Sequence, residues 1–162
     1  MKYQLVVIGT ALAVCSYSAF AGEKFDISTV ITKAEAEKIL GVPVNDPKGK
    51  NKEGTDGFYN SAWSYDAAKG DKALMLDLLV AGRDAPPNLT KTMFSVFPPG
   101  GGESISVDGL GEKAIFYHDK TGLDMLNVLK GDMLITIGIK GLPGTAALEL
   151  EKAAATKILA HL

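Results

Sequence analysis

The spacing of hydrophobic and polar positions changes several times along the chain, and each change marks an element. Residues 29–40 have the spacing of an amphipathic helix. Thr32 and Glu35 form a T-x-x-E capping box, in which each side chain can satisfy a free backbone amide of the first turn. Gly41 suits a left-handed helix end, and Pro43 prevents continuation. The pattern predicts a helix over about 29–40.

The next apolar segments have the period of strands. Residues 58–66 are rich in aromatic side chains, and residues 73–80 are almost entirely apolar, with Asp77 as the one charge. A short polar turn separates them, which predicts an antiparallel hairpin. Alternate side chains of a strand point to one face, and in 58–66 that face would carry three aromatic residues, Tyr59, Trp63 and Tyr65.

The rest of the chain predicts a helix, a meander and a closing helix. Residues 88–97 return to helical spacing after two prolines, with Asn88 as the expected cap. An Ala-rich helix is expected over about 145–161, with Thr145 as its cap. Between the two helices, tight turns join segments of strand character, namely 104–107, 113–119, 123–131 and 132–141.

One long segment has no such pattern. Residues 45–57 contain no apolar residue except Pro47, which predicts a solvated loop. Hairpin turns between consecutive strands predict an antiparallel sheet, and the helices interrupt the strands rather than alternate with them. We therefore predict an α+β fold, with an antiparallel sheet of about five strands packed by two to three helices.

The N-terminus has the three-part pattern of a secretory signal. Lys2 supplies the positive start, and residues 5–14 form an apolar core too short to span a bilayer. A small-x-small site, Ala-Phe-Ala, ends at Ala21. We expect residues 1–21 to be a signal peptide and residues 22–162 to form a single domain in the periplasm or outside the cell.

The same segment allows a second processing route. The sequence LAVC, which ends at Cys15, resembles a lipobox, whose cysteine is acylated and becomes the first residue. In that case the protein would be a lipid-anchored envelope protein. The sequence predicts membrane contact only through such an acyl chain on Cys15.

The amino-acid composition excludes several kinds of chemical site and partner. Cys15 is the only cysteine, so the exported domain would have no disulfide, no catalytic thiolate and no thiolate metal site. Removal of Lys2 with the signal leaves 16 basic against 19 acidic residues, and this net charge of −3 argues against a nucleic-acid partner. The two histidines, His118 and His161, do not form a zinc pattern. We expect neither a cofactor nor a bound metal.

A glycine motif resembles a nucleotide-binding loop. Gly109, Gly111 and Ala114 give G-x-G-x-x-A, but a dinucleotide loop must open a helix, and residues 114–117 have the composition of a strand. We therefore predict that the two glycines take positive φ angles and turn the chain into the meander.

The glycine motif also belongs to a wider resemblance. VDGLGEKAIFY, with the upstream ITKAEAEKILGVPV and SAWSYD and the terminal LEKAAATKILAHL, resembles small exported domains of bacterial lipoproteins and sensor ectodomains. The match spans most of residues 27–162. It lacks the cysteine pair of the commoner pattern, one member of which would fall near Ala62. The resemblance implies a PsbP/Mog1-like α+β domain that binds a ligand or a partner.

Three functions follow as hypotheses. The first is a non-enzymatic binding module that engages a small molecule or an envelope protein. Its expected contact residues are Tyr59, Trp63, Tyr65 and Asp77, together with the loops 45–57 and 98–103. The second is a carboxylate-based hydrolase that uses Asp77 or Glu112. Asp77 is a candidate because a charge inside an apolar strand is costly unless it is paired. The third is a structural subunit of an envelope complex, which predicts a broad flat apolar patch. His118, beside Asp119, is expected in a solvated turn rather than in a catalytic triad, since no G-x-S-x-G elbow exists.

Overall fold

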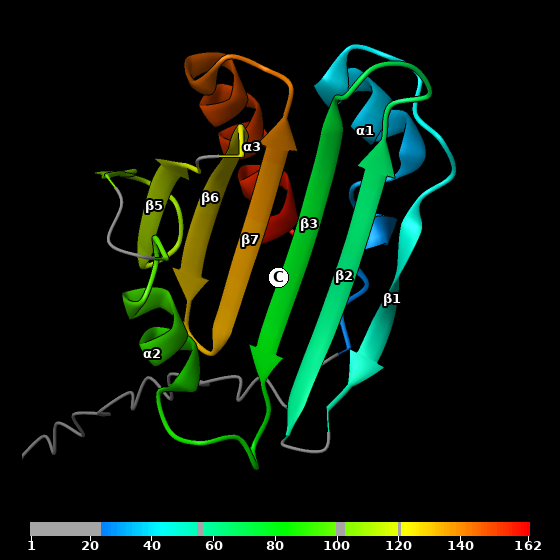
Figure 1. Ribbon diagram of the computed structural model, residues 1–162. Helices are drawn as coiled ribbons and strands as arrows, with labels where there is room; N and C mark the ends of the chain where they lie inside the picture. The colour runs from blue at the N-terminus through cyan, green and yellow to red at the C-terminus, as the bar shows by residue number, and fades with distance from the viewer. Residues whose placement is uncertain (1–23, 55–56, 100–102, 120) are drawn as a thin grey trace, which may run out of the picture.

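The computed structural model describes residues 24–54, 57–99, 103–119 and 121–162 (Figure 1). The predicted signal peptide and Cys15 lie outside this part of the chain. The described residues form one seven-stranded antiparallel sheet in the order β1-β2-β3-β7-β6-β5-β4. The elements are η1 (Ile27–Thr29), α1 (Lys33–Leu40), β1 (Lys48–Glu53), β2 (Phe58–Asp66), β3 (Ala73–Ala81), α2 (Leu89–Ser95), β4 (Ser104–Ser106), β5 (Lys113–His118), β6 (Leu123–Lys130), β7 (Met133–Lys140) and α3 (Gly144–Leu159).

The α+β class and the antiparallel sheet are confirmed, but the sheet has seven strands instead of about five. The largest difference is β1, whose six residues lie within the segment of 13 residues that was predicted as a loop over 45–57. All six of its residues are exposed. It pairs along its whole length with β2 through backbone hydrogen bonds. An edge strand needs no hydrophobic face to make those bonds, so its polar composition gave no strand signal.

The two faces of the sheet differ in their cover. In Figure 1, α1 and α3 lie behind the sheet and α2 in front of it. We call the side of α1, α3 and η1 the covered face. Alternate residues of the central strands fill its core, and these side chains are fully or almost fully buried, among them Leu74, Leu76, Leu78, Leu126, Val128, Ile135, Ile137 and Ile139. None of the helices in the described residues is long and apolar enough to cross a membrane.

Helix ends follow the predicted chemistry in part. Thr32 is the N-cap of α1, its side chain accepts a hydrogen bond from the Glu35 amide, and Gly41 ends the helix at φ 67°. The helix starts at Lys33, later than predicted, because residues 27–29 form a separate 3₁₀ turn capped by Asp26. Thr145 was predicted as the cap of α3, and this was wrong. The N-cap is Pro143, and it makes no side-chain cap bond.

The glycine motif is a turn between sheet segments, as predicted. Gly109 and Gly111 have φ angles of 80° and 57°, and β5 begins two residues later, at Lys113. A Cβ on Gly111 would lie 2.4 Å from the Leu129 carbonyl oxygen. The Glu112 amide donates to that same oxygen at 2.7 Å. The backbone after Gly111 therefore joins the sheet, and no helix N-terminus is presented to a phosphate.

Tyr65 ties the hairpin to the N-terminal segment. Its side chain is fully buried on the covered face. Its hydroxyl donates to the backbone carbonyl of Ile31, just before α1. This bond satisfies a carbonyl that would otherwise be buried without a partner.

We predict that Tyr65→Phe lowers the free energy of unfolding by about 1–3 kcal/mol, because the Ile31 carbonyl loses its donor while the ring packing is kept. Urea denaturation measures the change. An unfolding free energy equal to that of the wild type would contradict the role given to the hydroxyl.

Candidate functional site

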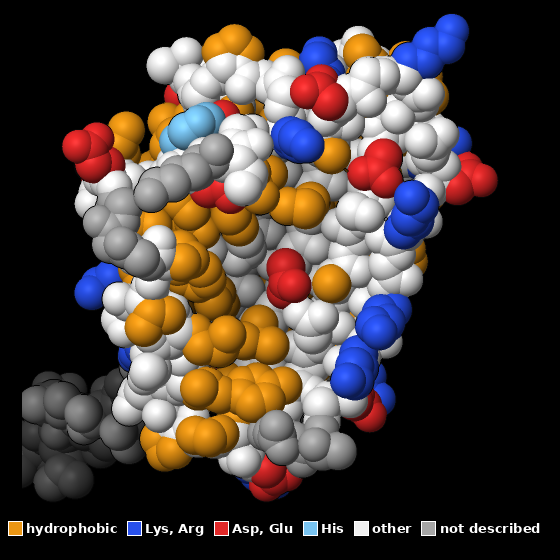
Figure 2. Space-filling model, in the orientation of Figure 1, with side chains coloured by type: hydrophobic (Ala, Val, Ile, Leu, Met, Phe, Trp, Pro, Cys, Tyr) orange, Lys and Arg blue, Asp and Glu red, His pale blue; other side chains and the backbone are white. Residues whose placement is uncertain are grey.

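The face opposite α1 and α3, which we call the open face, is only partly covered. The short helix α2 packs Phe94 against Leu129 and Leu134, near one end of the sheet. The space-filling view shows hydrophobic side chains exposed beside α2 and toward the middle of the sheet (Figure 2). A long hydrophobic area left open on a sheet is a candidate binding surface.

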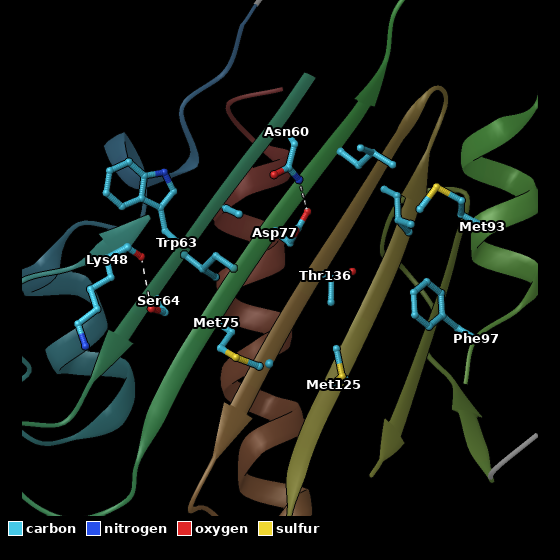
Figure 3. A pocket seen from close by; sticks show the side chains of 15 residues that line it. Lys48, Asn60, Trp63, Ser64, Met75, Asp77, Met93, Phe97, Met125 and Thr136 are labelled. Atoms are coloured by element: carbon cyan, nitrogen blue, oxygen red, sulfur yellow. Dashed lines mark hydrogen bonds between the residues drawn. The ribbon is translucent and has the colours of Figure 1, made fainter. Parts of the chain in front are cut away.

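A groove of about 580 Å³ lies on this open face. Its apolar side chains come from the central strands and from α2 and the residues after it, and Figure 3 shows how they surround the hollow. Three of them are methionines, whose flexible thioethers adapt to different shapes. The groove residues are Lys48, Asn60, Ala62, Trp63, Ser64, Met75, Leu76, Asp77, Leu79, Met93, Phe97, Met125, Leu134, Thr136 and Gly138.

Gly138 lies in the groove, on the central strand β7. Its φ angle is not in the left-handed region. A Cβ there would meet only flexible side-chain ends at 3.3 Å, those of Met75 and Leu123, and no backbone atom closer than 3.7 Å. Neither conformation nor backbone packing requires glycine here. A glycine inside a strand weakens it, and often marks a place where a ligand approaches the backbone.

Asp77 is the one carboxylate of the groove. Its carboxyl accepts a hydrogen bond of 2.7 Å from the Asn60 amide. Burial raises the pKa of Asp77 above its ordinary value, and the bond from Asn60 opposes that rise. Next along the same row of the sheet, Thr136 donates to the buried Asn127 at 2.7 Å. A polar row therefore crosses the otherwise apolar middle of the open face.

The structure separates the residues that the sequence grouped as a contact site. Tyr59, Trp63 and Tyr65 share a face of β2, as their spacing predicted. That face is the covered one, where Trp63 packs against the core and Tyr65 is fully buried. Asp77 pairs with Ala62, whose side chain points away from that of its neighbour Trp63. Asp77 therefore points to the open face. Trp63 is also one of the groove residues, although it packs against the core; of the four, only Asp77 points to the open face.

The other candidates lie elsewhere. Glu112 is at the turn before β5, where its carboxylate accepts from the Gly131 amide at 2.8 Å. His161 bonds the Lys157 carbonyl near the end of α3. His118 is exposed, but its Nδ1 lies 2.6 Å from Asp124, which is fully buried. Its partner is thus across the β5–β6 hairpin rather than in the neighbouring turn.

Asp124 also lies near a second buried acid. Glu151, on α3, is fully buried and accepts from the Ile139 amide at 3.1 Å. Asp124 Oδ2 and Glu151 Oε2 have no hydrogen-bond partner among the described residues. Burial, and next the charge of Asp124, raise the pKa of Glu151 to about 9. Glu151 is therefore protonated at neutral pH, which avoids two buried negative charges.

Sequence reasoning missed both the groove and the acid pair. A signal for Glu151 was present, because it occupies the helical stripe of Ala147, Ala154 and Ile158, all of which are buried. No sequence signal joined it to Asp124, 27 positions earlier. The groove depends on strands β3 and β7 lying side by side, which spacing alone did not predict.

Comparisons with known proteins add little. No protein-family model matches the chain, and no curated protein matches it. One solved structure is similar, the crystal structure of a GTP binding regulator from Thermotoga maritima, with 10% identity and a TM-score of 0.46. The match covers 83% of this chain and 87% of that one. A likeness this distant carries no argument about function.

The Glu151 carboxyl makes stability depend on pH. Its contribution is complete below pH 4.5, the ordinary pKa, where the group is protonated in both states, and it is lost as the pH rises through about 9. We predict that the free energy of unfolding of the wild type falls relative to Glu151→Gln over this range, by up to about 1.4 kcal/mol per pH unit.

Urea denaturation of the two proteins at a series of pH values measures this difference. Groups common to both proteins cancel in the comparison, and the glutamine keeps an acceptor for the Ile139 amide. Parallel stability curves from pH 4.5 to 9 would show that Glu151 ionises normally in the folded state.

Proposed function

We propose that the protein is a non-enzymatic binding module of the bacterial periplasm, and that its ligand is a small molecule held in the groove of the open face. The observation that carries this proposal is the groove of the open face, which Gly138 lines from the central strand β7. The groove leaves apolar side chains uncovered at the middle of the sheet, and glycine stands where a β-branched residue would make a better strand.

The groove has the composition of a ligand site. At about 580 Å³ it falls within the range of small-molecule pockets, which are mainly apolar with a few placed polar groups. Asp77 and Asn60 are hydrogen-bonded to each other, and they supply that polar part together with Thr136. Met75, which is 38% exposed, gives the rim an adaptable surface.

Two alternatives are less well supported. A carboxylate-based hydrolase would need two acids or an acid and a base in one pocket, and Asp77 is the only acid among the described groove residues. Glu112 is bonded at a separate turn. A structural subunit would need a flat apolar patch, whereas the open face contains a groove, and the exposed Val96 and Ile105 lie in different segments, just after α2 and in β4.

The cellular location and the family remain proposals as well. Export rests on the signal pattern of residues 1–21, with the acylated Cys15 form as the alternative. The PsbP/Mog1-like assignment is supported by the α+β class and by the turn at Gly109 and Gly111. Native mass spectrometry of protein recovered from the envelope would detect a terminus at Gly22 or an acyl chain, together with any retained ligand. An intact Met1 terminus on cytoplasmic material would contradict export.

We predict that Gly138→Val abolishes retention of the ligand, because the Met75 and Leu123 side-chain ends, 3.3 Å from the position of its Cβ, must shift and thereby change the shape of the groove. The preference of valine for a strand, up to about 1 kcal/mol over glycine, offsets the cost of that shift, so we expect the variant to fold. Native mass spectrometry reports the ligand, and thermal denaturation reports stability.

The matched control is Ala73→Val, which adds a branched side chain to the same face, outside the groove residues. It should retain the ligand. Full retention by a folded Gly138→Val protein would place the ligand elsewhere and contradict the proposal.

A further inference from the structure

The charged residues of the sheet are distributed unequally between its faces. By strand alternation and pairing, the charged side chains that point to the open face are Lys48, Lys50, Lys52, Asp66, Asp77, Lys113 and Lys140. The strand residues of the open face therefore include five lysines and two aspartates, and Lys48 is paired with Asp66 at 3.2 Å. Of the lysines within the strands, only Lys130 points to the covered face.

Three of these lysines come from β1, at one end of the groove. Lys48, Lys50 and Lys52 alternate along β1, opposite Ser64, Ala62 and Asn60, which are groove residues of β2. Figure 2 shows basic side chains along this edge of the molecule, and hydrophobic ones on the other side of the same view. Lys48 itself lines the groove.

The apolar end of the groove lies on the far side of Asp77. There Met93 and Phe97 lie on the side of Met125, which comes from β6 (Figure 3), and they pack against the cluster that contains Leu134 of β7. Four strand-to-strand steps separate β1 from β6, a span of about 19 Å at the usual spacing. A molecule that lies across the strands would meet methionine and phenylalanine at one end and lysine at the other.

We propose that the groove binds a single-chain anionic amphiphile, with its apolar chain over the methionines and its carboxylate or phosphate head beside the lysines of β1. This inference rests on the proposed function, because it names the ligand class of the same groove. It combines the apolar lining with the charge complementarity of the β1 edge.

Asp77 orients such a ligand. It lies between the two ends, in the row that contains Lys50 and Ala62, and it is held by Asn60. Its negative charge repels an anionic head that is placed over the centre of the groove. The arrangement therefore favours the orientation in which the head lies against β1 and the chain extends toward α2.

The test compares three probes that share one chain and differ in head group: dodecanoate, dodecyl maltoside and dodecyltrimethylammonium, each below its micelle concentration. Calorimetry measures the affinity of each probe, and NMR spectra of the ¹³C-labelled methionine methyl groups show where on the protein the probe binds. We expect shifts at Met75, Met93 and Met125 and not at Met133, which packs against the opposite core. Dodecanoate should bind at least about tenfold more tightly than the cation and should weaken as salt is added.

Substitutions of the β1 lysines and of Asp77 test separately the attraction and the repulsion of the anionic head. Lys48→Gln with Lys50→Gln should weaken dodecanoate about fivefold or more and leave the maltoside unchanged. Asp77→Asn should strengthen dodecanoate binding, because the repulsion is removed. Lys69→Gln, in the exposed β2–β3 turn, removes a lysine away from the groove and is the matched control, with no expected effect.

The outcomes separate the two proposals. Equal affinity for the three probes, or tighter binding of the cation, with shifts at the groove methionines, overturns the inference about charge and leaves the groove as a binding site. If no probe shifts those methionines, the amphiphile is excluded altogether. The retained-ligand measurement on wild type and Gly138→Val then decides the proposed function by itself.

Discussion

The antiparallel pairing of β3 with β7 is the interaction on which the rest of the structure depends. It joins the N-terminal hairpin to the C-terminal meander, and its register places Asp77 opposite Thr136. Because the pairs run through the whole sheet without a break in alternation, one choice of register assigns every side chain to a face. A slip of one residue would turn the buried leucines of β3 toward the open face and would place Asp77 in the core of the covered face.

The two faces then differ because the helices are unequal. The 16 residues of α3, together with α1 and η1, cover one face and bury its aliphatic side chains, whereas the seven residues of α2 cover only part of the other. The uncovered part keeps its apolar residues and adds Gly138. Glycine weakens its strand, and the exposed hydrophobic area of the groove is unfavourable for the isolated protein. A ligand that covers the groove would remove the second of these costs.

The acidic residues of the two faces show different solutions to one electrostatic problem. On the open face, Asp77 retains an amide partner and contact with the groove. On the covered face, Glu151 and Asp124 are fully buried, and protonation of Glu151 removes one of the two charges. The first is accessible to a ligand, and the second is enclosed by α3 and the sheet. The open face is therefore the place where charge can contribute to recognition.

The sequence by itself determined the α+β class, the cap at Thr32, the end at Gly41 and the turn at Gly109 and Gly111, because each depends on contacts within a few residues. It also placed Tyr59, Trp63 and Tyr65 on one face of a strand. Only the tertiary structure decided that this face is covered and that Asp77 faces the other way, since that follows from strand pairing. The edge strand β1, with its lysines, likewise required a partner, because its backbone bonds to β2 have no signature in side-chain pattern.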